Sequence, residues 1–273
     1  MTNSQVRRHK PVAAYALALF AGSVLLLATA TAAAAQEMTA EEASRAQANN
    51  PITSMYAINL QDFYVPSLYG VPDQGVNTLW ARAAIPVGRT ISRASLPLAT
   101  RPSSATEEQA GLGDFDFFTA YLIKSTPSAS FGVGPQVVVP TATDDALGSG
   151  KWKLGAAAVG FWASPLIQGG FLLTGNWSVA GDEERPSTGS AAFQPFVLWQ
   201  WGGGWYFRST GIMAFDLKSG DYVIPIGFGA GKVMKVGTAV FNMFLEPQIT
   251  VLHEGTGQPK LQFFFGLHMQ FPA

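Results

Sequence analysis

Two adjacent acidic residues, Asp144 and Asp145, stand between a Thr-Ala-Thr stretch and a Gly-Ser-Gly turn in the segment PTATDDALGSGKW. Paired carboxylates can bind a divalent cation or move protons in catalysis. A calcium site needs about six to eight oxygen ligands. This segment offers only the two carboxylates and a nearby threonine. We therefore interpret the pair as a solvated turn, with a contribution to divalent-ion bridging as the alternative.

The histidines that could act as catalytic bases outside the N-terminal segment are His253 and His268. A serine hydrolase needs its histidine beside a serine and an acid, and neither residue lies near a Gly-x-Ser-x-Gly motif. The chain has no cysteine, which excludes a thiolate nucleophile, a zinc-thiolate site and a disulfide framework. The sequence therefore predicts no catalytic residues, no metal site and no cofactor.

The N-terminus has the features of a secretory signal peptide. Basic residues precede the apolar run Val12–Ala28, and an alanine-rich cleavage site ends at Ala35. We predict a cleaved signal peptide over residues 1–35, with an uncleaved anchor helix as the alternative. A net charge of −1 and the absence of a Lys/Arg cluster after residue 10 argue against a nucleic-acid partner.

The composition points to a membrane protein that crosses as strands. Charged residues make up 13% of the chain, against about 25% in typical soluble proteins. After the signal segment, no stretch approaches the roughly 20 uninterrupted apolar residues that a spanning helix needs. Without such a helix, the backbone groups inside a bilayer can be satisfied only by a closed β-barrel.

Alternating apolar residues identify the strands. In KLQFFFGLHMQF, residues 260–271, one parity is wholly apolar and the other carries mainly Gln, Gly and His. The pattern recurs along the chain and predicts about twelve strands of about ten residues, the length that a tilted spanning strand needs. The predicted strands lie near residues 52–65, 79–87, 90–99, 115–123, 131–139, 152–163, 171–179, 193–200, 205–216, 222–231, 237–251 and 260–271.

The connections between these strands alternate in length. Tight turns are expected near residues 88–89, 125–128, 164–168, 201–204 and 235–237, and longer polar loops between them. This layout favours an all-β, transmembrane, antiparallel up-and-down β-barrel over residues 52–273 in the bacterial outer membrane. Aromatic residues near the strand ends are expected to form interfacial girdles: Trp80, Trp152, Trp162, Trp177, Trp199, Trp201, Trp205 and Tyr222.

Three segments carry a family resemblance: FGVGPQVVVPTATDDALGSGKWKLGAAAV, GNWSVAGDEERP and VIPIGFGAGKVMKVG. From about Asn50 to Phe271 the chain resembles the outer-membrane family named for the meta-pathway of phenol degradation, some members of which are labelled neuromedin U or transporter. The resemblance implies a β-barrel that passes small hydrophobic or aromatic molecules across the outer membrane. It supplies no functional residues to carry over.

The inward parity of the predicted strands supplies the candidate site. Charged and titratable side chains in a confined lumen can set its field and width, or can pair and plug it. The candidates for the lumen lining are Arg82, Arg93, Asp114, Asp116, Lys153, Arg208, Asp216, Glu246 and His268. Inward phenylalanines are predicted to form an apolar contact path for aromatic solutes: Phe161, Phe196, Phe244 and Phe264. Asp144 and Asp145 would lie on an outer rim loop.

The predicted function is passive uptake of small hydrophobic or aromatic molecules. The expected partners are outer-membrane lipid, lipopolysaccharide, the barrel assembly machinery and the solute. Residues 36–51 are polar and Ala/Glu-rich, which predicts a periplasmic leader or a plug. Two alternatives stay open: a structural or surface-interaction barrel that conducts nothing, and, less favoured, an outer-membrane lipid hydrolase.

Overall fold

A computed structural model describes residues 52, 55–103, 107–126, 128–164 and 166–272, all within one compact unit, Met38–Ala273. The predicted signal peptide and the predicted leader, residues 1–35 and 36–51, lie outside the described residues. Within the ranges just given, no helix is long and apolar enough to cross a membrane.

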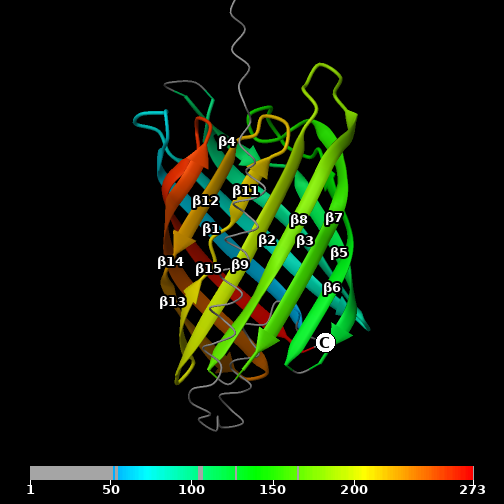
Figure 1. The fold of residues 1–273 in the computed structure, drawn as a ribbon, viewed down its shortest axis with the longest axis vertical. Helices are drawn as coiled ribbons and strands as arrows, with labels where there is room; N and C mark the ends of the chain where they lie inside the picture. The colour runs from blue at the N-terminus through cyan, green and yellow to red at the C-terminus, as the bar shows by residue number, and fades with distance from the viewer. Residues whose placement is uncertain (1–51, 53–54, 104–106, 127, 165, 273) are drawn as a thin grey trace, which may run out of the picture. The chain divides into compact units, whose positions relative to one another are not determined.

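The described part of the chain contains fifteen β-strands (Figure 1). In chain order they are β1 (Tyr56–Leu68), β2 (Val76–Val87), β3 (Thr90–Pro102), β4 (Glu108–Leu112), β5 (Phe115–Ser125), β6 (Ala129–Val139), β7 (Lys151–Ala163), β8 (Ile167–Gly181), β9 (Gly189–Gly202), β10 (Trp205–Ser209), β11 (Met213–Asp216), β12 (Tyr222–Gly227), β13 (Gly229–Val236), β14 (Ala239–Glu254) and β15 (Pro259–Phe271).

These strands form one closed antiparallel barrel. Neighbours in the chain pair with each other, and β1 pairs with β15, with Tyr56 opposite Phe271. Three positions in the barrel wall are each shared by two consecutive strands that do not pair with each other: β4 with β5, β10 with β11, and β12 with β13. The fifteen strands therefore make twelve crossings of the wall. This confirms the predicted all-β antiparallel barrel of about twelve strands.

The two ends of the barrel differ in their connections (Figure 1). At the end where β15 finishes, strands join through tight turns, and Gly88 and Gly237 occupy such turns with φ of 57° and 63°. Left-handed backbone of this kind suits glycine and matches the twist of a two-residue hairpin. At the opposite end the connections are longer, such as residues 140–150 between β6 and β7.

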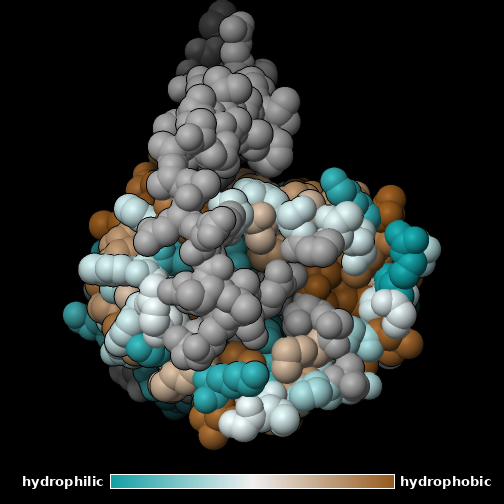
Figure 2. Space-filling view, turned by 90° about the horizontal axis from the view of Figure 1, so that it is seen from below, coloured by the Kyte–Doolittle hydropathy of each residue, from teal (hydrophilic) through white to brown (hydrophobic). Residues whose placement is uncertain are grey.

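The outward face of the strands is largely apolar, because side chains alternate between the two faces. Exposed examples are Ile58 and Leu60 on β1, Trp177 on β8 and Phe265 on β15. Seen along the barrel, hydrophobic residues lie at several places around its perimeter (Figure 2). This face has the composition that a lipid-facing barrel surface requires.

One predicted girdle residue was assigned wrongly. Trp80 shares the face of β2 with Arg82, whose guanidinium carbon lies 4.7 Å from the centre of the Trp80 ring, and the register of β2 is unbroken. The Trp80 ring therefore belongs to the barrel interior. Six other tryptophans are well exposed near the strand ends: Trp152, Trp162, Trp177, Trp199, Trp201 and Trp205.

Candidate functional site

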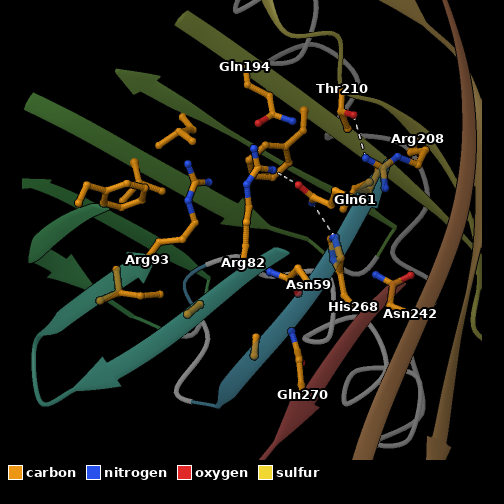
Figure 3. A pocket seen from close by; sticks show the side chains of 18 residues that line it. Asn59, Gln61, Arg82, Arg93, Gln194, Arg208, Thr210, Asn242, His268 and Gln270 are labelled. Carbon is orange, nitrogen blue, oxygen red and sulfur yellow. Dashed lines mark hydrogen bonds between the residues drawn. The ribbon is translucent and has the colours of Figure 1, made fainter. Parts of the chain in front are cut away.

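A cavity of about 150 Å³ lies inside the barrel, between side chains that come from both halves of the sheet (Figure 3). One part of its lining is polar or charged: Asn59, Gln61, Arg82, Arg93, Gln194, Arg208, Thr210, Asn242, His268 and Gln270. The other part is apolar: Ala57, Ala84, Ile91, Phe118, Val159, Leu172, Phe196 and Leu198. The site is thus amphipathic, which suits a small ligand with one polar and one apolar part.

A chain of polar side chains fixes Arg82. Its Nη1 donates a hydrogen bond to Oε1 of Gln61, whose Nε2 lies 2.7 Å from Nε2 of His268 (Figure 3). The three residues come from β2, β1 and β15, which are neighbours where the barrel closes. With Trp80 on its other side, the Arg82 guanidinium is held in one orientation toward the cavity.

Arg93 enters the cavity from the next strand, β3. Its guanidinium carbon lies 4.6 Å from the centre of the Phe118 ring. Asp116 on β5 is the acidic group that acts electrostatically on both Arg93 and Arg82. Asp116 itself accepts a hydrogen bond from Nε2 of Gln136 on β6. Arg93 is therefore packed against the Phe118 ring, while the Asp116 carboxylate is hydrogen-bonded to Gln136.

Arg208 and Glu246 form a buried ion pair. The Nε of Arg208 lies 2.7 Å from Oε2 of Glu246, and the Phe244 ring centre lies 3.3 Å from the guanidinium carbon. Thr210 completes the network, because its backbone amide and its hydroxyl each donate to the Glu246 carboxylate at 2.7 Å. Thr210 follows the end of β10, so the carboxylate satisfies a backbone donor that has left the strand ladder.

Three other predicted lumen residues lie toward the long-loop end. Asp114 precedes β5 and accepts hydrogen bonds from the amide and hydroxyl of Ser149, at 2.8 and 2.9 Å. Lys153 lies near the start of β7, where Asp114 and Asp116 act on its charge. Asp216 ends β11, and hydrogen bonds from the Ser219 and Lys218 amides hold its pKa below the usual range.

The acidic pair lies in the long loop between β6 and β7, as the sequence predicted. Oδ1 of Asp144 accepts a hydrogen bond from the Ala146 amide at 2.9 Å, the geometry of an Asx turn. The almost fully exposed Asp145 carboxylate pairs with Nη1 of Arg185 at 3.2 Å. Arg185 also donates to the Gly148 carbonyl at 2.6 Å. Asp144 therefore stabilises a turn within its own loop, and Asp145 links that loop to the neighbouring loop that carries Arg185.

The four phenylalanines predicted to line the lumen have two different roles: some pack in apolar clusters, and one lines the cavity. Phe161 is buried in an apolar cluster with Phe118, and Phe244 and Phe264 are buried in a second cluster. Phe196 packs against both clusters and lines the cavity. Three of the four rings thus fill the barrel interior, and one is available to a bound molecule.

Sequence reasoning missed several polar partners of these groups. Gln61, Gln136 and Asn242 all lie on the inward parity, and Asn242 accepts a hydrogen bond from the buried Tyr206 hydroxyl at 2.6 Å. A Gln or Asn on the inward parity of a strand could have been identified as a polar lumen residue from the sequence. Only the pairing register of the strands shows which side chain it contacts. Among the described histidines, His268 contacts Gln61, and the His253 ring stacks on the Tyr69 ring with their centres 3.6 Å apart.

A closed antiparallel barrel of twelve crossings with an apolar outer face defines a class by its fold, that of the transmembrane β-barrels. The chain is similar in structure to the COG4313 outer membrane channel from Pseudomonas putida F1, with a TM-score of 0.60 and 13% identity over 80% of this chain and 94% of that one. It is also similar to the NanC porin, with a TM-score of 0.51 and 10% identity over 79% of this chain and 100% of the porin.

At these identities the likeness is one of fold. No protein-family model matches the chain, and no curated protein matches it in sequence. The resemblance to the family named for phenol degradation therefore stays a prediction. What the structure adds is the amphipathic cavity inside the barrel, which the alternation pattern alone did not locate.

Proposed function

We propose that this protein is an outer-membrane channel for the passive uptake of small hydrophobic or aromatic molecules. The observation that carries the proposal is the cavity inside the barrel, whose lining combines the rings of Phe118 and Phe196 with polar and cationic groups. Aromatic molecules suit such a cavity, because their rings pack on apolar side chains and lie over guanidinium groups. The likeness to outer-membrane channel barrels supports the channel role.

The proposal includes a location. The chain would be exported with cleavage of residues 1–35, inserted by the barrel assembly machinery, and surrounded by outer-membrane lipid with lipopolysaccharide at the long-loop rim. Cell fractionation tests this directly. We expect the protein in the outer-membrane fraction, with migration on gels that changes on heating. Recovery in the soluble periplasmic fraction would contradict the proposal.

Transport is tested by the swelling of liposomes that contain the full mature chain. We expect swelling with small neutral solutes, and slower swelling when phenol is added, because an aromatic solute would occupy the cavity. Liposomes with the same amount of heat-denatured protein provide the control. Well-folded protein that supports no swelling would contradict an open channel.

The second candidate is a structural barrel that conducts nothing. The observation that favours it is the filled interior, in which the Arg208–Glu246 network and the clusters around Phe161 and Phe264 occupy much of the lumen. Residues 36–51 are a leader or a plug in our proposal, so a chain lacking them distinguishes the cases. If the plug closes an open barrel, its deletion raises the rate of swelling; if the barrel is structural, its deletion changes nothing.

An outer-membrane lipid hydrolase remains the less favoured candidate. Loss of lipid hydrolysis in His253→Ala would revive it.

A further inference from the structure

We propose that Arg82 and Arg93 form a binding site for the carboxylate of a small organic anion whose apolar or aromatic body packs on the opposite wall of the cavity. This inference rests on the proposed function, because it names the class of solute that the channel takes. The site lies on β2 and β3, adjacent strands whose inward side chains meet across one ladder.

The register brings the two guanidinium groups together. Arg82 lies opposite Ser95, and Arg93 lies opposite Ala84, so the arginines are diagonal neighbours on the inward face. Diagonal neighbours in an antiparallel pair are about 7–8 Å apart, within reach of long side chains. Figure 3 shows both side chains directed into the same cavity. A single carboxylate can therefore contact both.

The charges around the cavity are unbalanced. Its lining holds Arg82, Arg93 and Arg208 but, among the described residues, no Asp or Glu. Glu246 neutralises Arg208 at 2.7 Å. Among the described residues, Asp116 is the acid that acts electrostatically on the other two arginines, so one of their two positive charges is left without a counter-charge. Placing an anion there would offset the repulsion between two partly buried cations.

Unsatisfied donors point in the same direction. The Nε atoms of Arg82 and Arg93 are buried and have no hydrogen-bond partner in the part of the chain that the structure describes. Leaving a buried charged donor without a partner is costly. A carboxylate is a suitable partner for these donors, because the planar guanidinium group of arginine matches carboxylate geometry and often binds it in a bidentate way.

The opposite wall defines the rest of the ligand. Leu172 on β8 and Phe196 and Leu198 on β9 line the cavity there, and Phe118 adds an aromatic face beside Arg93. The cavity volume is about 150 Å³, the size of cavity that accommodates benzene in another protein. A single aromatic ring bearing one carboxylate fits this combination of charge, apolar surface and volume. Benzoate is the probe of choice, and benzamide is its neutral counterpart of nearly the same shape.

The test is isothermal titration calorimetry of the full mature protein in detergent with benzoate and with benzamide. We expect benzoate to bind at least about tenfold more tightly, and Arg93→Gln and Arg82→Gln each to remove most of that preference. Arg93→Lys should retain part of it, because the charge is kept. Lys218→Gln, which removes one positive charge from an exposed loop, is the matched control and should change nothing. Heat-modifiable migration checks that each variant folds.

The outcomes separate this inference from the channel proposal. Equal binding of benzoate and benzamide by a well-folded protein would overturn the anion site, whether or not the protein conducts. An unchanged preference in Arg82→Gln and Arg93→Gln would overturn it as well. Selective benzoate binding by a protein that supports no swelling would support the anion site and contradict the channel.

Discussion

The Nε of Arg208 lies 2.7 Å from Oε2 of Glu246, and both side chains are almost completely buried inside the barrel. The pair is surrounded by further donors, from Thr210 and from Nε2 of Gln248 at 3.0 Å. The carboxylate therefore joins β14 to the end of β10, where the ladder is interrupted. Because both charges are buried, each one needs the other as its counter-ion.

Removing one charge of this pair should destabilise the barrel strongly. Glu246→Gln leaves the Arg208 guanidinium buried without its counter-ion, which typically costs about 3–5 kcal/mol. We expect a lower unfolding temperature, measured by the loss of heat-modifiable migration. Asp145→Asn, at an exposed loop pair, is the control and should shift stability by no more than about 1 kcal/mol. Equal effects of the two changes would contradict a structural role for the buried pair.

Shortening Phe196 should widen the cavity. Phe196→Ala removes the one predicted phenylalanine that lines it, so we expect faster liposome swelling and weaker slowing by phenol. Phe228→Ala is the matched control, because that ring is 67% exposed and removes no cavity surface. If both variants behave alike, Phe196 does not control passage.

Asp62 is a carboxylate on the apolar outer face. It lies opposite Leu79 and opposite the exposed Phe265. Its side chain has a hydrogen bond with Asn77, but Oδ1 is buried without a partner among the described residues. Charged groups that face lipid destabilise barrels, acids less than bases. Asp62→Leu should therefore raise the free energy of unfolding in lipid by about 1–2 kcal/mol. Denaturant titration in vesicles measures this, and a loss of stability would show that the hydrogen bond to Asn77 outweighs the cost of the charge.

The loop between β11 and β12 should respond to acid. Asp216 accepts hydrogen bonds from the Lys218 and Ser219 amides, at 2.7 and 3.0 Å, and its pKa is lowered in the fold. A lowered pKa means that the carboxylate stabilises the loop above pH 3.8, the ordinary value, and that this contribution is lost as pH falls through the lower folded value.

Amide hydrogen exchange measures that response. We expect the Lys218 and Ser219 amides to be protected at neutral pH and to lose protection, after correction for intrinsic rates, as Asp216 is protonated. Asp216→Ala should lack the protection at every pH. Protection that persists in Asp216→Ala would show that the carboxylate is not its source.

Strand positions followed closely from the sequence, because a lipid-facing barrel imposes the same two-residue alternation on every crossing. The segment predicted at 152–163 is β7, Lys151–Ala163, and the segment predicted at 52–65 is β1, Tyr56–Leu68. The interruption after β10 was not predicted, since it depends on where Glu246 reaches the backbone amide of Thr210. The interruption between β12 and β13 was not predicted either.

The site was only partly predictable. Parity identified Arg82, Arg93 and His268 as inward residues, but the Gln61 link between Arg82 and His268 depends on the closure of β1 on β15, which no local pattern encodes. Trp80 was assigned to the girdle from its residue type and its position near a strand end. Its parity, which it shares with Arg82, indicates the barrel interior instead. The packing of Phe244 against Phe264 follows from the register of the neighbouring strands β14 and β15.

Single-channel conductance of the refolded mature protein in planar bilayers tests the central claim most directly. We expect discrete conductance steps that phenol reduces, and a weaker reduction in Phe196→Ala. A bilayer that stays silent although the protein is folded and inserted, with the chain lacking residues 36–51 silent as well, would contradict the channel and favour the structural barrel.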